Sequence, residues 1–396
     1  LLGESAVGVG GLVHDSSTVV FAGGGTGGHF YPALALANEL VSQRPEVRPV
    51  FIGASRGIES RILPGKGIEY NLLPVRGWKR GQFLANIGVP WALLKSFISA
   101  IKLHKKYNSK LVIVTGGYSS APAGLAAILM GIPLILQEQN AHPGVTTRVL
   151  SLWARQIHVA FSEAVLHLPR KVRNLALISG CPIESPRKIS LNRNEICEKL
   201  GLDQKYKVLL VTGGSQGSVA LNDLVLGILQ NQRESRQGFF SQWQILWIAG
   251  PGNYELVSRE INRIEGCSRV KVLPYLESMP WALNLADLAI SRAGAMTTSE
   301  LMAWGVPAIL VPLPTAAANH QELNALAIQK LGAATYMSQL GLTSDKLWME
   351  IGRLTENEEI LSRMADKARR NSKPEATFKV VSSMLKFLPE SKGRMA

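Results

Sequence analysis

Residues 19–40 read VVFAGGGTGGHFYPALALANEL and join a short β-rich run to a glycine loop and a helix. The run 19–22 is apolar, the loop 23–28 fits the pattern G-x-G-x-x-G, and residues 33–40 carry apolar side chains at helical spacing. Glycines there let the backbone approach a ligand, and the helix N-terminus favours a negative oxygen. This unit predicts a Rossmann-like α/β fold.

The same plan continues along the chain. Continuous apolar runs, typical of buried parallel strands, occupy 50–52, 111–114 and 133–136. A second series opens with 208–211 and the glycine loop 213–217, and further strands are predicted at 245–248, 270–273, 288–290 and 308–311. Because open α/β sheets bind ligands at the carboxyl ends of their strands, we predict two Rossmann-like domains with both glycine loops facing a central cleft.

The domain boundaries are predicted from changes in pattern. Residues 162–205 lose periodicity and contain several prolines, so we expect the interdomain connection there. We therefore divide the chain into a flexible leader, 1–17, an N-terminal domain, 18–183, and a C-terminal domain, 184–371. Residues 372–396 are expected to form a helical segment that packs back on the N-terminal domain. The small, Gly-rich leader is unlike a secretory signal, and we expect processing, truncation or a removed organelle transit peptide.

Composition excludes several classes of protein. The chain has 396 residues, of which 46% are hydrophobic, enough for a sizeable core. Its three cysteines show no C-x-x-C spacing and its seven histidines no H-E-x-x-H pair, so we predict neither a disulfide framework nor a metal, and no cofactor. The longest charge-free stretch, 111–136, is interrupted by Gly and Pro and is too broken to span a membrane.

Positive charge is concentrated in one segment. The chain carries 43 Lys and Arg against 29 Asp and Glu, a net charge of +14, and no acidic residue occurs between Glu69 and Glu138. Aromatic and aliphatic side chains alternate with the cations there, which favours docking on an anionic membrane surface. A solvated basic face over a core helix is the alternative. Nucleic acid is not predicted as a partner, because no recognised binding motif accompanies the charge.

His29 closes the first glycine loop at the start of the predicted helix. A histidine beside an anion-binding loop suits a general base, and we favour this role over a helix-start residue. Two further loops, GGYSS at 116–120 and QEQN at 137–140, follow predicted strands. Their side chains are placed to hydrogen-bond sugar hydroxyls, with turn or capping roles as the alternative.

The second half supplies matching loops. The loop 213–217 offers backbone N–H groups to a phosphate, and 291–300 has a second glycine turn that enters a helix. Glu300 would accept both hydroxyls of a ribose, unless it is an ordinary first-turn partner of the helix dipole. His320, Gln321 and Asn324 follow another buried strand and would contact sugar hydroxyls or cap a helix.

Together the motifs resemble the MurG glycosyltransferase family. They are GGGTGGHFYPALALANEL (23–40), GGYSSAPAGLAA (116–127), GIPLILQEQN (131–140), GGSQGSVALND (213–223), ISRAGAMTTSELMAWGVPAILVPLP (290–314) and NHQELNA (319–325). The resemblance implies a glycosyltransferase-B fold and a metal-independent, inverting hexosyltransferase of peptidoglycan synthesis. Such an enzyme moves N-acetylglucosamine from UDP-N-acetylglucosamine to the 4-hydroxyl of a polyprenyl-diphosphate-linked muramoyl-peptide, converting lipid I to lipid II.

The resemblance also implies roles for individual residues. His29 would be the base, and the acceptor side would comprise Thr26, Gly27, Gly28, Tyr118, Glu138 and Asn140. The UDP-sugar side would comprise Ser215, Gln216, Gly217, Leu276, Met279, Gly294, Ala295, Met296, Thr297, Glu300, His320, Gln321 and Asn324. Membrane contact would be made by Trp78, Lys79, Arg80, Phe83 and Trp91.

One position departs from the family pattern. Where the family usually has Gly-Asn-Pro-Val-Arg, with an Arg that reaches the donor diphosphate, this chain reads GCPIE at 180–184. A carboxylate at Glu184 would repel the diphosphate, and Arg187 is the candidate substitute. This change and the leader suggest a plastid member, on the stroma or envelope face in a plant or alga. A bacterial member would lie on the cytoplasmic face of the plasma membrane.

Three alternatives stay open on sequence grounds. A galactosyl transferase that makes glycolipids from UDP-galactose and diacylglycerol resembles the same family. A non-catalytic, membrane-associated binding protein of the same fold would explain Glu184. An NADP oxidoreductase, with Ser55 and Arg56 around the 2′-phosphate, would leave the loops at 213–217 and 291–300 unexplained.

Overall fold

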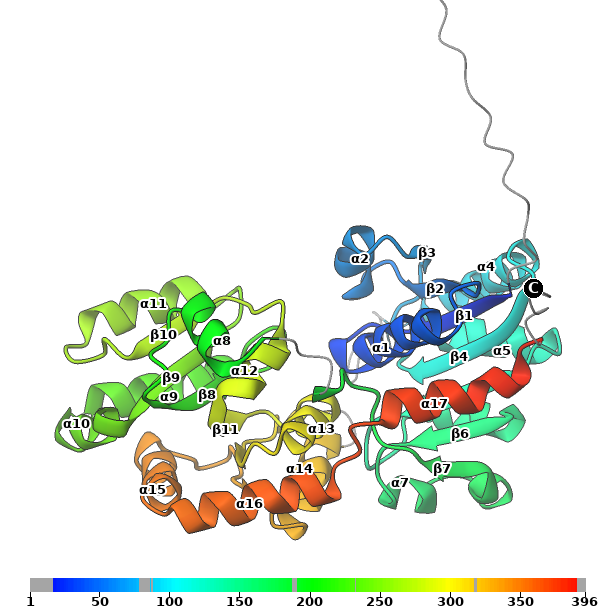
Figure 1. Cartoon of the computed structure of the whole chain (residues 1–396). Coiled ribbons are helices and arrows are strands. Elements are labelled where there is room, and N and C mark those ends of the chain that lie inside the picture. Colours follow the sequence, from blue (N-terminus) through cyan, green and yellow to red (C-terminus); the bar gives the residue numbers. More distant parts are fainter. Residues whose placement is uncertain are drawn as a thin grey trace, which may run out of the picture.

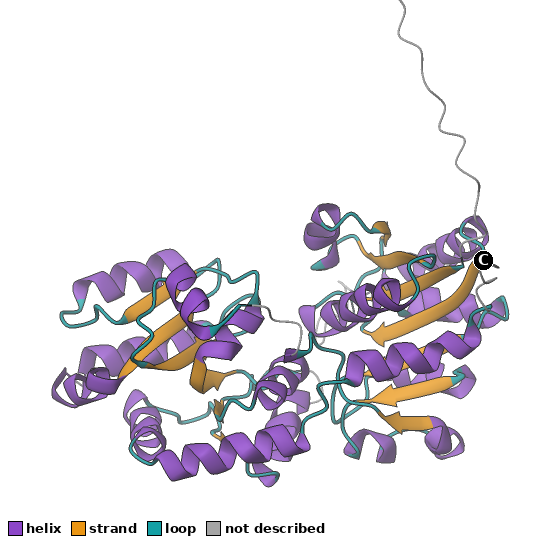
Figure 2. Cartoon of the chain, viewed as in Figure 1, coloured by secondary structure: helices purple, strands orange, loops and turns teal. Residues whose placement is uncertain are grey.

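The computed structural model describes residues 17–77, 86, 88–186, 191–231, 233–316 and 319–389. The chain forms two lobes, each with a parallel sheet between layers of helices (Figures 1 and 2). The predicted fold class is confirmed: the protein is α/β, with two Rossmann-like domains. The predicted leader lies outside the described residues except for Ser17.

The first sheet has seven parallel strands in the order β3-β2-β1-β4-β5-β6-β7. Their bounds are β1 Thr18–Gly23, β2 Arg48–Ala54, β3 Glu69–Leu73, β4 Ser109–Gly116, β5 Leu134–Glu138, β6 Gln156–Val159 and β7 Ala176–Ile178. Strand order reverses between β1 and β4, so the loops after these strands flank the point where such sheets bind ligands. His29 and Tyr118 follow these two strands.

The second sheet has six parallel strands in the order β10-β9-β8-β11-β12-β13, which repeats the plan of the first. Their bounds are β8 Lys207–Thr212, β9 Trp243–Ile248, β10 Val270–Leu273, β11 Ala286–Ser291, β12 Ala308–Leu310 and β13 Ala334–Tyr336. The reversal falls between β8 and β11, and the loops after these strands are 213–218 and 292–294. Both glycine turns of this half therefore lie at one switch point.

Helices cover both faces of each sheet (Figure 2). In the first domain they are α1 Gly27–Gln43, α2 Glu59–Ile62, η1 Leu63–Gly65, α4 Val89–Lys106, α5 Ala121–Leu129, α6 Val145–Leu150, η2 Ser151–Trp153, α7 Glu163–Leu166 and η3 Arg170–Leu175. The rest are α8 Arg193–Leu200, α9 Val219–Asn231, α10 Arg233–Gln242, α11 Tyr254–Arg263, α12 Met279–Leu285, α13 Ala295–Trp304, α14 His320–Lys330, α15 Ser344–Thr355, α16 Glu358–Asn371, α17 Ala376–Met384 and η6 Leu385–Phe387. No helix in the described part of the chain is both long and apolar enough to cross a bilayer.

The chain crosses between the domains twice. The stretch 162–205 contains β7, the last strand of the first sheet, and α8, whose Ile196, Cys197 and Leu200 pack in a core of the second domain. Near the C-terminus, α16 lies on the second domain and α17 returns to pack beside α1 of the first (Figure 1). Val380 and Met384 of α17 are fully buried in that core. The last helix is therefore part of the first domain's packing.

Strands that sequence reasoning did not predict are short or lie at sheet edges. β3, with the sequence EYNLL, is polar and half-buried because it has a neighbour on one side only. β6 has four residues, of which two are polar, and β13 is a three-residue edge strand. Their hydrophobic runs are too short to be distinguished from loops, so tertiary pairing decides them.

Candidate active site

His29 lies in the first turn of α1, directly beyond the first glycine loop. Its Nδ1 lies 3.0 Å from the carbonyl oxygen of Thr115 and 3.1 Å from Oε1 of Gln139. Both partners are acceptors, so Nδ1 carries the proton in the neutral ring and Nε2 carries the free lone pair. This tautomer is the one that a general base acting through Nε2 requires.

Gln139 accepts a hydrogen bond from the imidazole of His29, and its own side chain is fixed by further hydrogen bonds. Its side chain is buried, and Nε2 donates to the Thr115 carbonyl at 2.8 Å and to the Gln137 carbonyl at 3.2 Å. These bonds place Oε1 toward Nδ1 of His29. Sequence analysis expected the QEQN side chains to contact sugar hydroxyls and did not place Gln139 beside His29. That proximity, across 110 positions, arises only from the pairing of β1, β4 and β5.

The first glycine loop surrounds a buried carboxylate. Glu59 is fully buried, and both of its oxygens accept from the N–H of Gly25, at 3.0 and 2.9 Å, while Oε1 also accepts from Ala54 N at 2.7 Å. A Cβ on Gly24 would lie 2.1 Å from this carboxylate, and one on Gly57 would lie 2.2 Å from it. These glycines therefore make room for Glu59. Sequence analysis missed this residue, whose only signal is its closeness to Gly53 and Gly57.

Glu138 organises the loop that carries Asn140. Its Oε1 accepts from the backbone N–H and the side-chain amide of Asn140, both at 3.1 Å. Its Oε2 accepts from the N–H of Gly144 at 3.1 Å and the hydroxyl of Thr147 at 2.7 Å. Glu138 is buried and fully hydrogen-bonded, so it positions Asn140.

The predicted acceptor and donor loops face each other across the cleft. A Cβ placed on Gly27 would lie 3.4 Å from the hydroxyl oxygen of Ser215. One pocket of about 410 Å³ is lined by both loops and by cations of the first domain: Gly25, Thr26, Gly27, Arg56, Gly57, Ile58, Ser60, Arg61, Ser215 and Gln216. Tyr31 on α1 meets Tyr275 of the second domain, with 3.2 Å between hydroxyls. The structure therefore brings Thr26 and Gly27 of the predicted acceptor side and Ser215 and Gln216 of the predicted donor side to one pocket.

Arg292 is a buried cation beneath the donor loop, and sequence analysis gave it no role. Its guanidinium donates to the Ser218 hydroxyl at 2.8 and 3.1 Å and to the carbonyls of Val311 and Pro312 at 2.9 and 3.1 Å. No carboxylate forms an ion pair with it within the described residues. Desolvation lowers the pKa of Arg292 from its usual value, yet an arginine stays charged. Its signal in the sequence is a single cation between the apolar strand β11 and a glycine turn.

Glu300 and Glu184 lie close enough to interact. Glu300, on α13, is half-buried, and its pKa is raised to about 7, first by burial and second by the like charge of Glu184. Glu184 is exposed. The departure from the family pattern therefore faces the residue predicted to hold the ribose. Arg187, the candidate substitute, lies outside the described residues.

The other predicted donor residues surround the start of α13. Gly294 is the N-cap of this helix, and Ala295, Met296 and Thr297 form its first turn. Leu276 and Met279 are half-buried against the core of the same domain. His320 and Gln321 begin α14, and Oε1 of Gln321 accepts from Leu313 N at 3.0 Å.

Asn324 forms a hydrogen bond between the two domains. It is fully buried, its Oδ1 accepts from Ala141 N of the first domain at 3.1 Å, and its Nδ2 donates to the Ala293 carbonyl at 3.2 Å. Both ends of the amide thus have protein partners, and the contact joins the acceptor-side loop after Asn140 to the turn before α13. The structure gives Asn324 a linking role.

Four of the five predicted membrane residues, Trp78, Lys79, Arg80 and Phe83, lie outside the described residues. The fifth, Trp91, lies in the first turn of α4 and is 75% exposed. Leu94 and Ile98 on the same helix are 48% and 47% exposed, and Lys95 and Lys102 are also exposed. This part of α4 presents an apolar face with cations beside it.

Comparisons with known proteins agree with this geometry. The glycosyltransferase family 28 N-terminal domain matches residues 19–159, and the family 28 C-terminal domain matches residues 208–380. A relative from Desulfitobacterium hafniense is 37% identical over 371 residues, covering 93% of this chain and 98% of the relative. One from Halothermothrix orenii is 38% identical, covering 90% and 95%. Both are named UDP-N-acetylglucosamine--N-acetylmuramyl-(pentapeptide) pyrophosphoryl-undecaprenol N-acetylglucosamine transferase.

The chain belongs to the MurG family of glycosyltransferases. The solved structure of Acinetobacter baumannii MurG is 29% identical and superposes with a TM-score of 0.71, covering 93% of this chain and 99% of that one. The UDP-N-acetylglucosamine 2-epimerase of Neisseria meningitidis, solved with UDP-N-acetylglucosamine, is 14% identical with a TM-score of 0.64. It covers 94% of this MurG-family chain and all of its own, and shares the fold alone. The resemblance read from the motifs is confirmed.

Proposed function

We propose that this chain transfers N-acetylglucosamine from UDP-N-acetylglucosamine to the 4-hydroxyl of a lipid-linked N-acetylmuramoyl-peptide, with inversion at the anomeric carbon. The observation that carries this proposal is the His29 tautomer: Nδ1 is hydrogen-bonded to Thr115 and Gln139, which leaves the lone pair on Nε2. Gly27, two residues before His29, lines the pocket shared with Ser215 and Gln216 of the donor loop. The names of the relatives favour this activity over galactosyl transfer and over a non-catalytic role.

The reaction balances as follows. His29 Nε2 takes the proton of the acceptor 4-hydroxyl while that oxygen forms a bond to the anomeric carbon of N-acetylglucosamine. The bond from that carbon to the UDP oxygen breaks, and UDP leaves with both electrons. The N–H groups of Gly214 and Gly217 donate within the protein. Those of Ser215, Gln216 and the first turn of α13 are proposed to stabilise the developing negative charge on the diphosphate.

Arg292 and Glu184 are proposed to act in opposite directions on binding of the donor diphosphate. We propose that its buried charge offsets the repulsion between Glu184 and the diphosphate, since it lies behind the same loop and no described acidic side chain neutralises it. Ser215, Gln216 and Gly217 are proposed to contact the diphosphate. Glu300 is proposed to hold the ribose, Leu276 and Met279 to border the uracil, and His320 and Gln321 to contact the sugar.

On the acceptor side, Thr26, Gly27, Gly28, Tyr118 and Asn140 are proposed to surround the muramoyl sugar, with Glu138 holding Asn140. The exposed apolar side chains of α4 and the neighbouring cations are proposed to dock on an anionic membrane. Lipid-linked acceptors reside in that membrane, so docking would deliver them to the cleft. The protein would then be peripheral, on the cytoplasmic face of a bacterial membrane or the stromal face of a plastid envelope.

The decisive experiment measures UDP release from UDP-N-acetylglucosamine with a soluble analogue of the acceptor, comparing the wild type with His29→Ala. We expect kcat to fall by about 10²–10⁴-fold, the range typical for loss of a general base, with an unchanged Kd for the donor. UDP-galactose serves as the control donor and should be used poorly. Equal losses of turnover and donor binding would give His29 a structural role, and preference for UDP-galactose would overturn the proposed donor.

A further inference from the structure

The first glycine loop is poorly suited to receive a second anion. The Gly25 N–H already donates to both oxygens of Glu59, and that carboxylate is enclosed by Gly24, Gly53 and Gly57, where a Cβ would approach its oxygens to 2.1, 3.0 and 2.2 Å. A diphosphate on this loop would meet a fixed negative charge. The acceptor's diphosphate therefore needs another place, and this inference rests on the proposed function.

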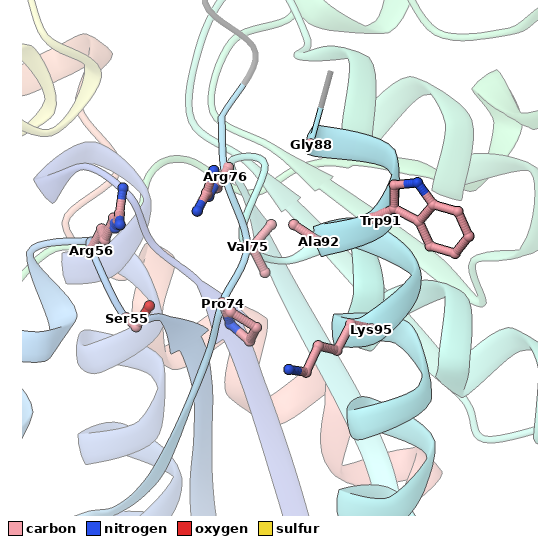
Figure 3. Close-up of a pocket in the computed structure, with 9 residues that line it drawn as sticks. All are labelled: Ser55, Arg56, Pro74, Val75, Arg76, Gly88, Trp91, Ala92 and Lys95. Carbon is pink, nitrogen blue, oxygen red and sulfur yellow. The ribbon is translucent and has the colours of Figure 1, made fainter. Parts of the chain in front are cut away.

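Cations gather in a pocket beside that loop. Its volume is about 410 Å³, and it is lined by Ser55, Arg56, Pro74, Val75, Arg76, Gly88, Trp91, Ala92 and Lys95, none of which is acidic. Figure 3 shows that Arg56, Arg76 and Lys95 reach it from three separate segments, which are the turn after β2, the turn after β3 and helix α4. Among the described residues, no carboxylate forms an ion pair with any of these three. Their charge is available to an anion.

The pocket lies between the cleft and the proposed membrane face. Arg56 lines both this pocket and the one that contains Thr26, Gly27 and Ser215. At the other side, Trp91 belongs to the exposed apolar face of α4 and points away from the cations (Figure 3). The pocket therefore shares Arg56 with the pocket at the cleft and Trp91 with the exposed face of α4.

Tyr118 connects the same two regions. A Cβ on Gly25 would lie 2.8 Å from Cε1 of the Tyr118 ring, and a Cβ on Gly77 would lie 3.1 Å from the same atom. The ring therefore sits between the glycine loop that precedes His29 and the turn that carries Arg76. Arg76 directly precedes Gly77, so the turn that carries this cation packs against the ring that also contacts the glycine loop.

We propose that Arg56, Arg76 and Lys95 bind the diphosphate of the lipid-linked acceptor. The acceptor consists of a sugar, a diphosphate and a polyprenyl chain, in that order, and the molecule offers the base, three cations and an exposed apolar face in the same order. Two guanidinium groups and one ammonium group match a diphosphate better than a single phosphate. The pocket would then select acceptors by their diphosphate and fix the sugar at His29.

The test uses the full-length double variant Arg76→Gln/Lys95→Gln. In an assay with soluble acceptor analogues and no vesicles, we expect KM of the variant for the diphosphate acceptor to be at least tenfold higher than that of the wild type. Its Kd for UDP-N-acetylglucosamine should stay within twofold of the wild-type value. The wild type should prefer a diphosphate acceptor to its monophosphate counterpart, and the variant should lose that preference. In calorimetric titration, geranyl diphosphate should bind the wild type more tightly than geranyl monophosphate, and the variant should bind both equally weakly.

The matched control is Lys66→Gln/Lys171→Gln, which removes two exposed cations of the first domain that do not line the pocket. An unchanged KM and unchanged geranyl diphosphate binding in the pocket variant would overturn the proposal. So would an equal rise of KM in the control. Weaker binding to anionic vesicles with normal acceptor kinetics would assign the pocket to a phospholipid headgroup. Absence of turnover in the wild type would instead refute the proposed transferase, while the titrations would still test the pocket.

Discussion

Single residues in the cleft are tuned by neighbours that are distant in the sequence. Glu300 is 116 positions from Glu184, yet the like charge of Glu184 and burial together raise the pKa of Glu300 to about 7. A carboxylate accepts both ribose hydroxyls, whereas a protonated carboxyl group loses part of its acceptor capacity. Donor binding by this chain should therefore depend on pH in the neutral range.

We expect the affinity for UDP-N-acetylglucosamine to rise as pH rises from 6 to 8, by up to about tenfold, because Glu300 loses its proton through this window. Glu184→Gln should shift the rise to lower pH, since it removes the like charge. It should also strengthen binding throughout, because it removes repulsion from the diphosphate. Isothermal titration across pH measures both effects. A profile in Glu300→Gln that still rises like the wild type would show that another group is responsible.

Helix α4 illustrates how an element can face away from the core. Ser96, Ala100 and His104 form its buried stripe, whereas the exposed Trp91 and Leu94 lie on the outer side. An element that leaves large apolar side chains in water next to several cations has the features of a membrane-docking surface. Sequence analysis predicted this surface from composition, and only the structure distinguishes its outer face from its buried stripe.

Replacing both Trp91 and Leu94 with Ser should weaken binding to vesicles that contain anionic phospholipid by about tenfold or more, because two apolar side chains no longer insert. Raised salt should also weaken the binding of the wild type to these vesicles, because the neighbouring cations contribute to it. Met349→Ser is the matched control, as Met349 is 73% exposed on the other domain. Vesicle sedimentation measures the partition. Equal losses in the variant and the control would move the docking surface elsewhere.

At the scale of the whole molecule, the C-terminal segment joins the two domains. Helix α16 covers the second domain and α17 completes the first (Figure 1). Ser383 of α17 contacts a buried histidine of β6. His158 Nε2 lies 3.1 Å from Ser383 Oγ, and Nδ1 lies 2.6 Å from Ser179 Oγ. Burial lowers the pKa of His158 to about 4. The folded state therefore disfavours protonation of this ring.

Stability should therefore fall as pH falls. The pKa of His158 is 6.5 in the unfolded chain and about 4 in the folded protein, so between these values the unfolded state binds a proton that the folded state does not. Lowering the pH from 7.5 to 5 should therefore reduce the free energy of unfolding by about 2 kcal/mol through this one group. Urea unfolding of the full chain at both pH values checks this, with His158→Asn expected to show a smaller loss. An identical loss in the variant would assign the pH dependence to other groups.

The sequence alone determined the α/β class, the two glycine loops, the family and the candidate base His29, because strand and loop patterns are local and continuous apolar runs mark buried parallel strands. Tertiary structure alone decided that Gln139 fixes the His29 tautomer, that Glu59 occupies the first glycine loop and that Arg292 lies beneath the second. It also gathered Arg56, Arg76 and Lys95 into one pocket. These relations depend on which strands pair and where their ends meet, and the spacing of residues along the sequence does not determine strand pairing.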